Sequence, residues 1–326
     1  MKTLDSVRLF LVASLLLYGC SLQEDFEYAS QRDLIAANGF LHPDSTVSVS
    51  LARTAPYPKG DSVIPLEGAL VKLYENDVLL GDVPYDAEKR AYTLNYYPKE
   101  TYAYRLVVRV NGKDSLTATT RIPANSIVQA CANEYSPEGT GWLSGRVRTN
   151  MHIERTDPVA TVWIAMTSRN FKRYRVEGPP YSRVDSSVIE TRPFWSLYTN
   201  SAYADPFNGY KDEGLNGYMP YLRLNPASRL PTYDLDVGSM EGGYYDAHQR
   251  LPDGLGQYVH VYTASEEYDR FLKNAVINYL NSNEEADIPN PFAEQVVTYS
   301  NVKGGTGVFA GYHAATFYVR NLNKCQ

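Results

Sequence analysis

Histidine and cysteine are scarce in this sequence, which limits the metal and redox chemistry that can be predicted for it. The 326 residues contain 5 histidines and 3 cysteines, and the histidines are scattered without a His-Glu-x-x-His motif. A zinc site would therefore need ligands gathered from distant segments. The best local cluster, Asp246 and His248 with Asp234 and Asp236 nearby, is equally well explained as a solvated loop. We predict no metal site and no cofactor.

Long apolar runs and basic runs are missing beyond the N-terminus. No segment after the first 20 residues holds the run of about 18 apolar residues that indicates a transmembrane helix, so none is predicted there. The net charge is −6, and the chain has no run of five or more basic residues. Nucleic-acid binding needs a positive surface that meets the phosphates. We therefore expect no nucleic-acid partner.

The common catalytic signatures are missing as well. No Gly-x-Ser-x-Gly elbow is present, so a serine hydrolase of that type is not supported. A nucleotide loop joins a strand to a helix, whereas Gly304, Gly305, Gly307 and Gly311 are followed by strand-like sequence and are predicted to form a turn or bulge. A glycosidase needs two carboxylates at a set separation, which a sequence does not reveal. We predict no catalytic residue and a non-enzymatic protein.

The first 19 residues have the pattern of a signal peptide. An apolar run over residues 9–17 is interrupted only by Ser14, and it is shorter than the roughly 20 residues that span a membrane. The Leu-Tyr-Gly-Cys sequence at 17–20 resembles a lipobox, in which cleavage precedes the cysteine and a lipid attaches to it. We predict lipid attachment at Cys20. The alternative is an ordinary secretory signal that a cysteine follows by chance.

Residues 20–33 are predicted to form a lipidated, flexible tether. They are polar and contain few aliphatic residues. Glu24, Asp25 and Glu27 follow the lipid-bearing cysteine closely, which resembles the acidic export signal of lipoproteins on the outer face of the outer membrane in Bacteroidetes-type bacteria. A solvated spacer with chance charges is the alternative. We expect a lipid-anchored protein at the outer membrane that faces the cell exterior.

The two remaining cysteines, Cys131 and Cys325, form an even pair in a chain predicted to be exported to an oxidising compartment. A disulfide between them would fix the C-terminal end to the start of the second domain. Two separate thiols are the alternative, because the long separation in sequence gives no local spacing signal.

Residues 34–125 have the pattern of an immunoglobulin-like β-sandwich. Alternating apolar and polar residues run over 47–51 and 102–110, and turn signals separate the short predicted strands. Asn111-Gly112, flanked by strand patterns, predicts a tight hairpin turn. The sequence over 121–125 is typical of the end of a domain, and a mature chain of about 300 residues favours two domains.

Residues 126–326 are predicted to form a β-rich α+β domain with one clear helix near 265–281. Ser265 is a suitable N-cap, and acidic residues follow it in the first turn. Apolar residues then recur at spacings of three and four from Tyr268 to Leu280, which predicts a helix that packs on a sheet. The fold class is therefore mainly β, and residues 178–256 are predicted to contain long loops.

Tyrosine is the one abundant aromatic residue, with 28 Tyr against 10 Phe and 3 Trp. Its apolar ring and polar tip suit contacts with sugars and peptides at wet interfaces. It is also favoured in strands. Composition alone therefore leaves open whether the tyrosines form a binding surface or reflect a β-rich exported protein.

Several segments together resemble the Bacteroidetes surface-lipoprotein family catalogued as domain of unknown function 4249. The resemblance covers nearly all of the mature chain and is weakest over residues 170–255. Its most specific block lies near the C-terminus and contains Asn290, Pro291, Phe292, Ser300, Asn301, Gly304, Gly305, Gly307, Phe309 and Gly311. The resemblance implies a two-domain surface lipoprotein, often encoded beside a TonB-dependent transporter. It carries no catalytic residues, and we expect the block to be structural.

These observations favour a non-enzymatic accessory lipoprotein beside a TonB-dependent outer-membrane transporter, acting in nutrient capture or complex assembly. The C-terminal domain would supply the recognition surface. A surface hydrolase of glycans or peptides is one alternative, although no catalytic constellation is visible. A structural adhesin or assembly factor without a small ligand is the other.

Overall fold

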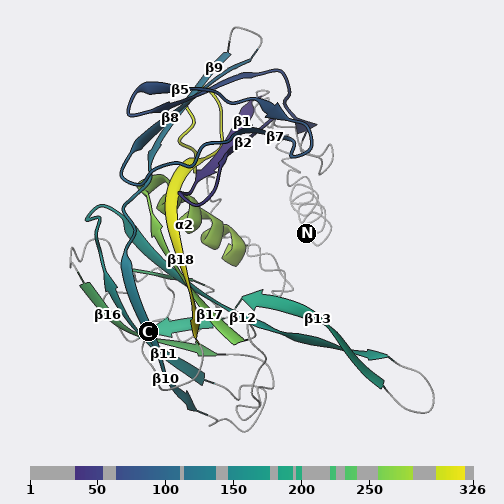
Figure 1. Cartoon of the computed structure of the whole chain (residues 1–326), viewed down its shortest axis with the longest axis vertical. Helices are drawn as coiled ribbons and strands as arrows, with labels where there is room; N and C mark the ends of the chain where they lie inside the picture. Colours follow the sequence, from purple (N-terminus) through teal and green to yellow (C-terminus); the bar gives the residue numbers. More distant parts are fainter. Residues whose placement is uncertain are drawn as a thin grey trace, which may run out of the picture.

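The computed structural model describes residues 34–53, 64–110, 114–136, 146–176, 183–193, 196–199, 221–224, 232–240, 256–281 and 299–319. Within these ranges the chain is mainly β with a single helix, which confirms the predicted fold class. The strands form a 10-stranded sheet and two 4-stranded sheets. Each smaller sheet packs against a different part of the large sheet, so the molecule has two layered β regions (Figure 1).

The N-terminal sandwich is the first of these regions. One layer contains β1 (Ile35–Leu41), β2 (Val47–Arg53), β3 (Ile64–Pro65), β6 (Tyr85–Asp86) and β7 (Ala91–Leu94). The other contains β4 (Leu70–Glu75), β5 (Val78–Asp82), β8 (Ala103–Val110) and β9 (Asp114–Arg121). Alternate residues of β2 and β8 are buried between the layers, as the period of two predicted. The expected turn at Asn111-Gly112 lies outside the described residues, between the paired strands β8 and β9.

The C-terminal region also has two facing sheets. The smaller one contains β10 (Ile127–Ser136), β11 (Arg146–Glu154), β14 (Ser196–Thr199) and β16 (Thr232–Met240). It faces β12 (Thr161–Val176), β15 (Tyr221–Arg223), β17 (Gly256–Ala264) and β18 (Phe309–Val319) of the large sheet, in which β13 (Arg183–Pro193) is the edge strand beside β12. Met151 and Leu235 from the smaller sheet pack with Ile164 and Val261 from the larger one. Burial of these side chains holds the two layers together.

Helix α2 (Glu266–Asn281) lies on the opposite face of the large sheet, beside β17 and β18 (Figure 1). The backbone N–H of Tyr268 donates to Ser265 Oγ at 3.2 Å, so the predicted N-cap is confirmed. Three acidic residues of the first turn face the positive end of the helix dipole. Within the described residues no helix is long and apolar enough to cross a membrane.

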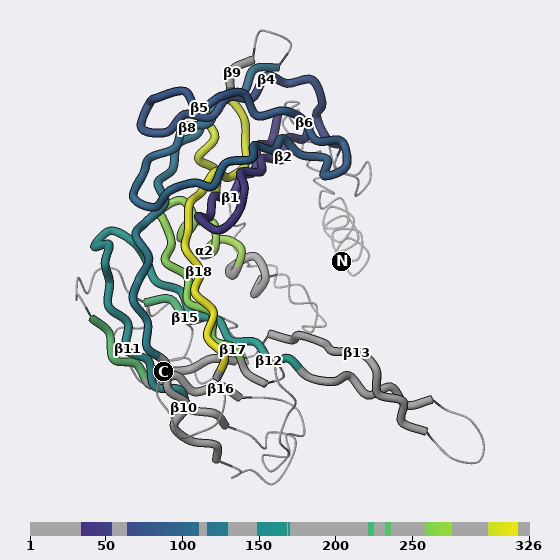
Figure 2. Tube along the Cα trace, viewed as in Figure 1, coloured from purple at the N-terminus to yellow at the C-terminus, as the bar shows by residue number. Residues whose placement is uncertain are grey.

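Strand β18 belongs to both regions. Residues 309–311 pair in parallel with β1, and residues 312–319 pair antiparallel with β17. The strand can be followed in Figure 2 from the N-terminal sandwich down to the C-terminal sheets. The large sheet is therefore continuous across both regions.

The segment before β18 completes the N-terminal core, although the predicted boundary at residue 125 placed it in the C-terminal domain. Val302 and Phe309 are buried in the same cluster as the side chains of β1, β2 and β8. Glycine residues allow this segment to pass close to the backbone of the N-terminal strands. A Cβ atom on Gly307, whose φ is +110°, would lie 2.2 Å from Ala37 O, and one on Gly311 would lie 2.5 Å from Arg121 O. Only a residue without a side chain fits at these two approaches.

Candidate functional site

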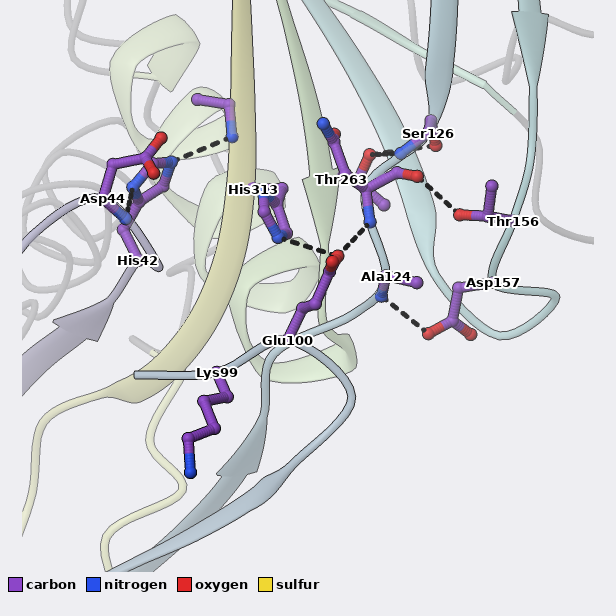
Figure 3. Close-up of polar contacts among 12 residues, drawn as sticks. His42, Asp44, Lys99, Glu100, Ala124, Ser126, Thr156, Asp157, Thr263 and His313 are labelled. Carbon is purple, nitrogen blue, oxygen red and sulfur yellow. Dashed lines mark hydrogen bonds and ion pairs between the residues drawn. The ribbon is translucent and has the colours of Figure 1, made fainter. Parts of the chain in front are cut away.

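A group of polar side chains joins the two regions beside β18, and we call it the seam (Figure 3). It consists of His42 after β1, Glu100 before β8, Asp157 before β12, Thr263 on β17 and His313 on β18. The continuous sheet brings these five residues together, although they are far apart in the sequence.

His42 joins the turn after β1 to strand β18. Its Nδ1 lies 3.1 Å from the backbone N of Asp44, and its Nε2 lies 3.2 Å from the backbone N of Ala314. Both ring nitrogens therefore face backbone N–H donors. A neutral imidazole has one lone pair to offer, and a protonated one has none. Burial lowers the pKa of His42, although Asp44 opposes the shift, so this surrounding keeps the ring neutral near pH 7.

His313 is buried at the centre of the seam. Its Nε2 lies 3.2 Å from Glu100 Oε2, which is within ion-pair range, yet the contact does not have hydrogen-bond geometry. Glu100 Oε2 instead accepts the backbone N–H of Asn125 at 3.0 Å. Burial lowers the pKa of His313, and the nearby His42 adds to the shift, whereas Glu100 and Asp44 oppose it. The two histidine rings are 5.7 Å apart.

Asp157 fixes the connection between the two regions. Its buried carboxylate accepts a hydrogen bond from the guanidinium of Arg121 and another from the backbone N–H of Ala124, at 3.3 Å for the latter. Thr263 Oγ1 accepts the backbone N–H of Ser126 at 3.2 Å and donates to its hydroxyl at 2.9 Å. The residues that leave β9 are therefore bonded to the turn before β12 and to β17. Such pairing is what buried polar groups require.

The chemistry available to the seam is structural. Among the described residues, no group of three or more His, Cys, Asp and Glu side chains is arranged to hold a metal ion. Glu100, Asp157 and Thr263 are bonded to the backbone of residues 124–126. Polar groups that are used in this way fix the relative position of two elements. The seam can therefore hold the two regions in register.

A second polar cluster lies beneath α2. Asp269 accepts from Arg223 in a bidentate pair, with Nε to Oδ1 and Nη2 to Oδ2 both at 2.7 Å. The indole N–H of Trp163 also donates to Asp269 Oδ1, at 2.8 Å. All three residues are buried. The cluster therefore attaches the first turn of α2 to β15 and β12 and sets the position of the helix on the sheet.

The site residues expected from the sequence are divided between described and undescribed parts of the chain. The lipid-attachment residue Cys20 lies outside the described residues, as do Cys325, Asn290, Pro291 and Phe292. Cys131 lies in β10, but the structure does not describe its side chain, so the predicted disulfide remains a prediction.

The described part of the C-terminal block supports the core. Asn301 Nδ2 donates to Phe309 O and to Thr119 O, and Asn301 Oδ1 accepts from the backbone N–H of Phe309. Ser300 accepts the backbone N–H of Val302. Gly304 adopts a φ of +83° in the turn, and a Cβ on Gly305 would lie 2.4 Å from Ile35 O. These residues close the N-terminal sandwich.

The seam itself was not expected from the sequence. His42 and His313 are two of the five histidines scattered along the sequence. They come together because β18 pairs with both β1 and β17, and no local pattern encodes that pairing.

Comparisons with known proteins add little to this geometry. No family model matches the chain, and no curated protein matches it. One solved structure shows a likeness, a protein of Corynebacterium diphtheriae whose description provisionally assigns it to membrane-anchored proteins. The two are 12% identical, and the likeness covers 70% of this chain and 54% of the other, with a TM-score of 0.19. Such a TM-score does not indicate a shared fold, so nothing is transferred from that protein.

Proposed function

We propose that this chain is a lipid-anchored, non-enzymatic lipoprotein on the outer face of the outer membrane. There it serves as an accessory to a TonB-dependent transporter, in nutrient capture or in assembly of the complex. The resemblance of the sequence to a surface-lipoprotein family supports this role. The lipobox-like residues at 17–20 and the acidic residues that follow them support the location.

The single observation that best supports display of the C-terminal region is the double pairing of β18. The predicted tether over 20–33 precedes β1 directly, and β1 pairs with β18. Strand β18 then continues into the C-terminal sheet beside β17. A lipid at Cys20 would therefore hold the N-terminal sandwich at the membrane, and the continuous sheet would carry the C-terminal region as a connected unit.

The seam supports a binding role over a catalytic one. Glu100 and Asp157 accept hydrogen bonds from the backbone of the connecting residues 124–126. His42 faces backbone N–H donors on both sides of its ring. These groups are committed to holding the two regions together, which suits a protein that presents a fixed surface to a partner.

The partner is tested by co-purification from native membranes. The protein, tagged at its C-terminus, is extracted in mild detergent, and the proteins that accompany it are identified by mass spectrometry. We expect an outer-membrane barrel in stoichiometric amount. Purification of the protein alone, under conditions in which other membrane complexes stay intact, would contradict the transporter role.

The anchor is tested separately by metabolic labelling with a palmitate analogue. We expect the label on the wild-type protein and on a Cys131→Ser variant, and no label on a Cys20→Ser variant. The Cys131→Ser variant is the matched control, because it removes a cysteine that the lipobox-like sequence does not include. Equal labelling of both variants would show that Cys20 is not the attachment residue.

A further inference from the structure

Four tyrosines gather where α2 lies on the outer face of the large sheet, and we call them the tyrosine surface. Tyr262 on β17 and Tyr312 on β18 are diagonal neighbours in the sheet, Tyr221 is on β15, and Tyr268 is in the first turn of α2. Tyr268 and Tyr312 are stacked, with ring centroids 4.5 Å apart and planes at 7°. The centroids of Tyr262 and Tyr312 are 6.3 Å apart. All four side chains are half-buried.

The hydroxyl groups of this surface have no hydrogen-bond partner within the described part of the chain. Two tyrosines of the N-terminal sandwich behave differently. The Tyr92 hydroxyl donates to Leu66 O and accepts from the backbone N–H of Ala69, both at 2.9 Å. The Tyr104 hydroxyl donates to Glu75 at 2.8 Å. None of these four hydroxyls is among the described side-chain atoms that are both buried and without a partner, so they reach solvent and are free to bond to water or to a ligand.

The four hydroxyls are also close enough to influence one another. Burial raises the pKa of Tyr268, and the neighbouring Tyr312, Tyr262 and Tyr221 raise it further. Burial likewise raises the pKa of Tyr262, with Tyr221 and Tyr312 contributing. The raised pKa values keep the hydroxyls of Tyr262, Tyr268 and Tyr312 protonated at physiological pH. Each can donate one hydrogen bond and accept others.

The tyrosine surface is electrically neutral. No charged side chain contributes to the pKa shifts of Tyr262, Tyr268 or Tyr312. Of the neighbouring charged residues, Arg223 and Asp269 are buried and paired with each other, Glu266 pairs with Arg270, and Glu267 accepts a hydrogen bond from Thr120. The charges around the surface are therefore already engaged, and Tyr268 and Tyr312, which cover one face of each other's ring, do not form a cage for a cation.

Apolar rings extend the surface at its edge. Phe40 lies at the end of β1 and is 36% exposed. Its ring centroid is 5.7 Å from that of Tyr268 and 5.0 Å from that of Phe271. Unbonded hydroxyls next to exposed aromatic rings match a ligand that has both hydroxyl groups and apolar C–H faces. A sugar ring has this combination, and sites for small ligands combine apolar walls with a few polar groups in the same way.

We propose that the tyrosine surface binds a neutral saccharide, with its aromatic rings against the C–H faces of the sugar and its hydroxyls bonded to those of the sugar. This deepens the capture role proposed above by naming a ligand class, and it rests on that role only for its biological purpose. The binding itself does not require a transporter.

The test is calorimetric titration of the full-length lipoprotein in detergent with defined oligosaccharides. The probes are the hexamers of α-1,4-glucose, β-1,4-glucose, β-1,4-mannose and β-1,4-xylose, with hexagalacturonate as an acidic comparator. We expect at least one neutral hexamer to bind, and to bind equally well at about 50 and about 500 mM salt, because a neutral ligand gains nothing from charge attraction. Binding of the acidic comparator alone, or of no hexamer, would overturn the proposal.

Variants locate the site. A Tyr262→Phe/Tyr312→Phe protein keeps both rings and loses two hydroxyls, so we expect the affinity to fall about 4- to 100-fold, since each lost hydrogen bond weakens binding about two- to tenfold. Tyr97→Phe is the matched control, because Tyr97 is 58% exposed on the N-terminal sandwich. Circular dichroism checks that each variant is folded. Undiminished binding by the double variant would place the ligand elsewhere.

The two proposals fail in different ways. Saccharide binding by a protein that purifies without a barrel would retain the tyrosine site and reject the transporter partner. A barrel that co-purifies with a protein unable to bind any neutral hexamer would retain the accessory role and reject the site.

Discussion

The two faces of the sheet formed by β12, β17 and β18 come from alternate residues of the same strands, yet their chemistry is opposite. The inner face presents Val162, Ile164, Met166, Val259 and Val261 to the smaller sheet, and each of these is at most 2% exposed. The outer face presents Trp163, His260, Tyr262 and Tyr312, of which only Trp163 is fully buried. One face is a dry aliphatic layer and the other is an aromatic layer with polar tips.

The difference separates the buried side chains of both faces, which stabilise the fold, from the half-buried tyrosines of the outer face, which are left for recognition. Aliphatic side chains on the inner face contribute through area removed from water and through close packing. The outer face is only partly covered by α2, which is held there by the buried pair of Arg223 and Asp269. The hydroxyls of Tyr262 and Tyr312 have no partner within the described residues, so they contribute little to folding. The predictions below test this separation, beginning with the largest expected effect.

Removal of the charge beneath the helix should have the largest effect on the free energy of unfolding. In an Asp269→Asn variant the buried Arg223 guanidinium loses its carboxylate, and breaking a buried pair in this way costs about 3–5 kcal/mol. Urea denaturation followed by circular dichroism measures the change. The matched control is Glu266→Gln on the same helix, whose exposed pair with Arg270 should contribute less than about 0.5 kcal/mol. Similar losses in both variants would mean that the buried pair does not fix the helix.

Truncation on the inner face should have the next largest effect. Ile164 is completely buried, so an Ile164→Ala variant should lose about 2–5 kcal/mol of unfolding free energy through the lost burial and the cavity that remains. Ile127, which is 53% exposed on β10, provides the comparison, and Ile127→Ala should change stability by less than about 0.5 kcal/mol. Both are measured by the same denaturation. If the two variants were equally stable, the packing between the sheets would be looser than the structure shows.

Local patterns in the sequence predicted part of the fold. Strand β8 was predicted because its even-numbered residues are buried between two sheets, and burial is what a period of two records. Helix α2 was predicted because Ser265 caps it and its apolar residues recur at helical spacing. Both signals are local, so a single sequence contains them.

The pairing of β18 with β1 could not be predicted in this way. Gly39 lies opposite Phe309, some 270 residues later in the chain, and no local pattern states that these positions meet. The seam was missed for the same reason, because His42, Glu100 and His313 come together only through that pairing. The glycines of the closing block were predicted to be structural, but the close approach that requires them is visible only in three dimensions.

Acidification should weaken the seam and so lower the free energy of unfolding, by a smaller amount than the two substitutions above. The pKa values of His42 and His313 are lowered in the folded chain by burial, against the opposing carboxylates of Asp44 and Glu100. A histidine with a lowered folded pKa stabilises the fold fully above its unfolded pKa of about 6.5, and this stabilisation is lost as the pH falls below that value. Unfolding free energy should therefore decrease as the pH falls from 7 towards 5.

The pH effect can be assigned by comparison with a His42→Gln/His313→Gln variant, measured by urea denaturation at each pH. The variant has no titrating imidazole at the seam, so the decrease should be smaller than in the wild type. The remaining slope includes His260, whose pKa is also lowered by burial, on the outer face. A slope identical to that of the wild type would show that the seam does not sense pH in this range.

The smallest effect on the free energy of unfolding is expected for a tyrosine hydroxyl of the outer face. Removal of the Tyr262 hydroxyl, in a Tyr262→Phe variant, should change the free energy of unfolding by less than about 0.5 kcal/mol, because that hydroxyl has no partner within the described residues. In Tyr92→Phe the same chemical change should cost about 1–3 kcal/mol, because it leaves Ala69 N–H and Leu66 O without their buried partner. Thermal denaturation of both variants measures the contrast. If Tyr262→Phe were as costly as Tyr92→Phe, the hydroxyl would already be engaged inside the protein, and the tyrosine surface would have nothing left to offer a sugar.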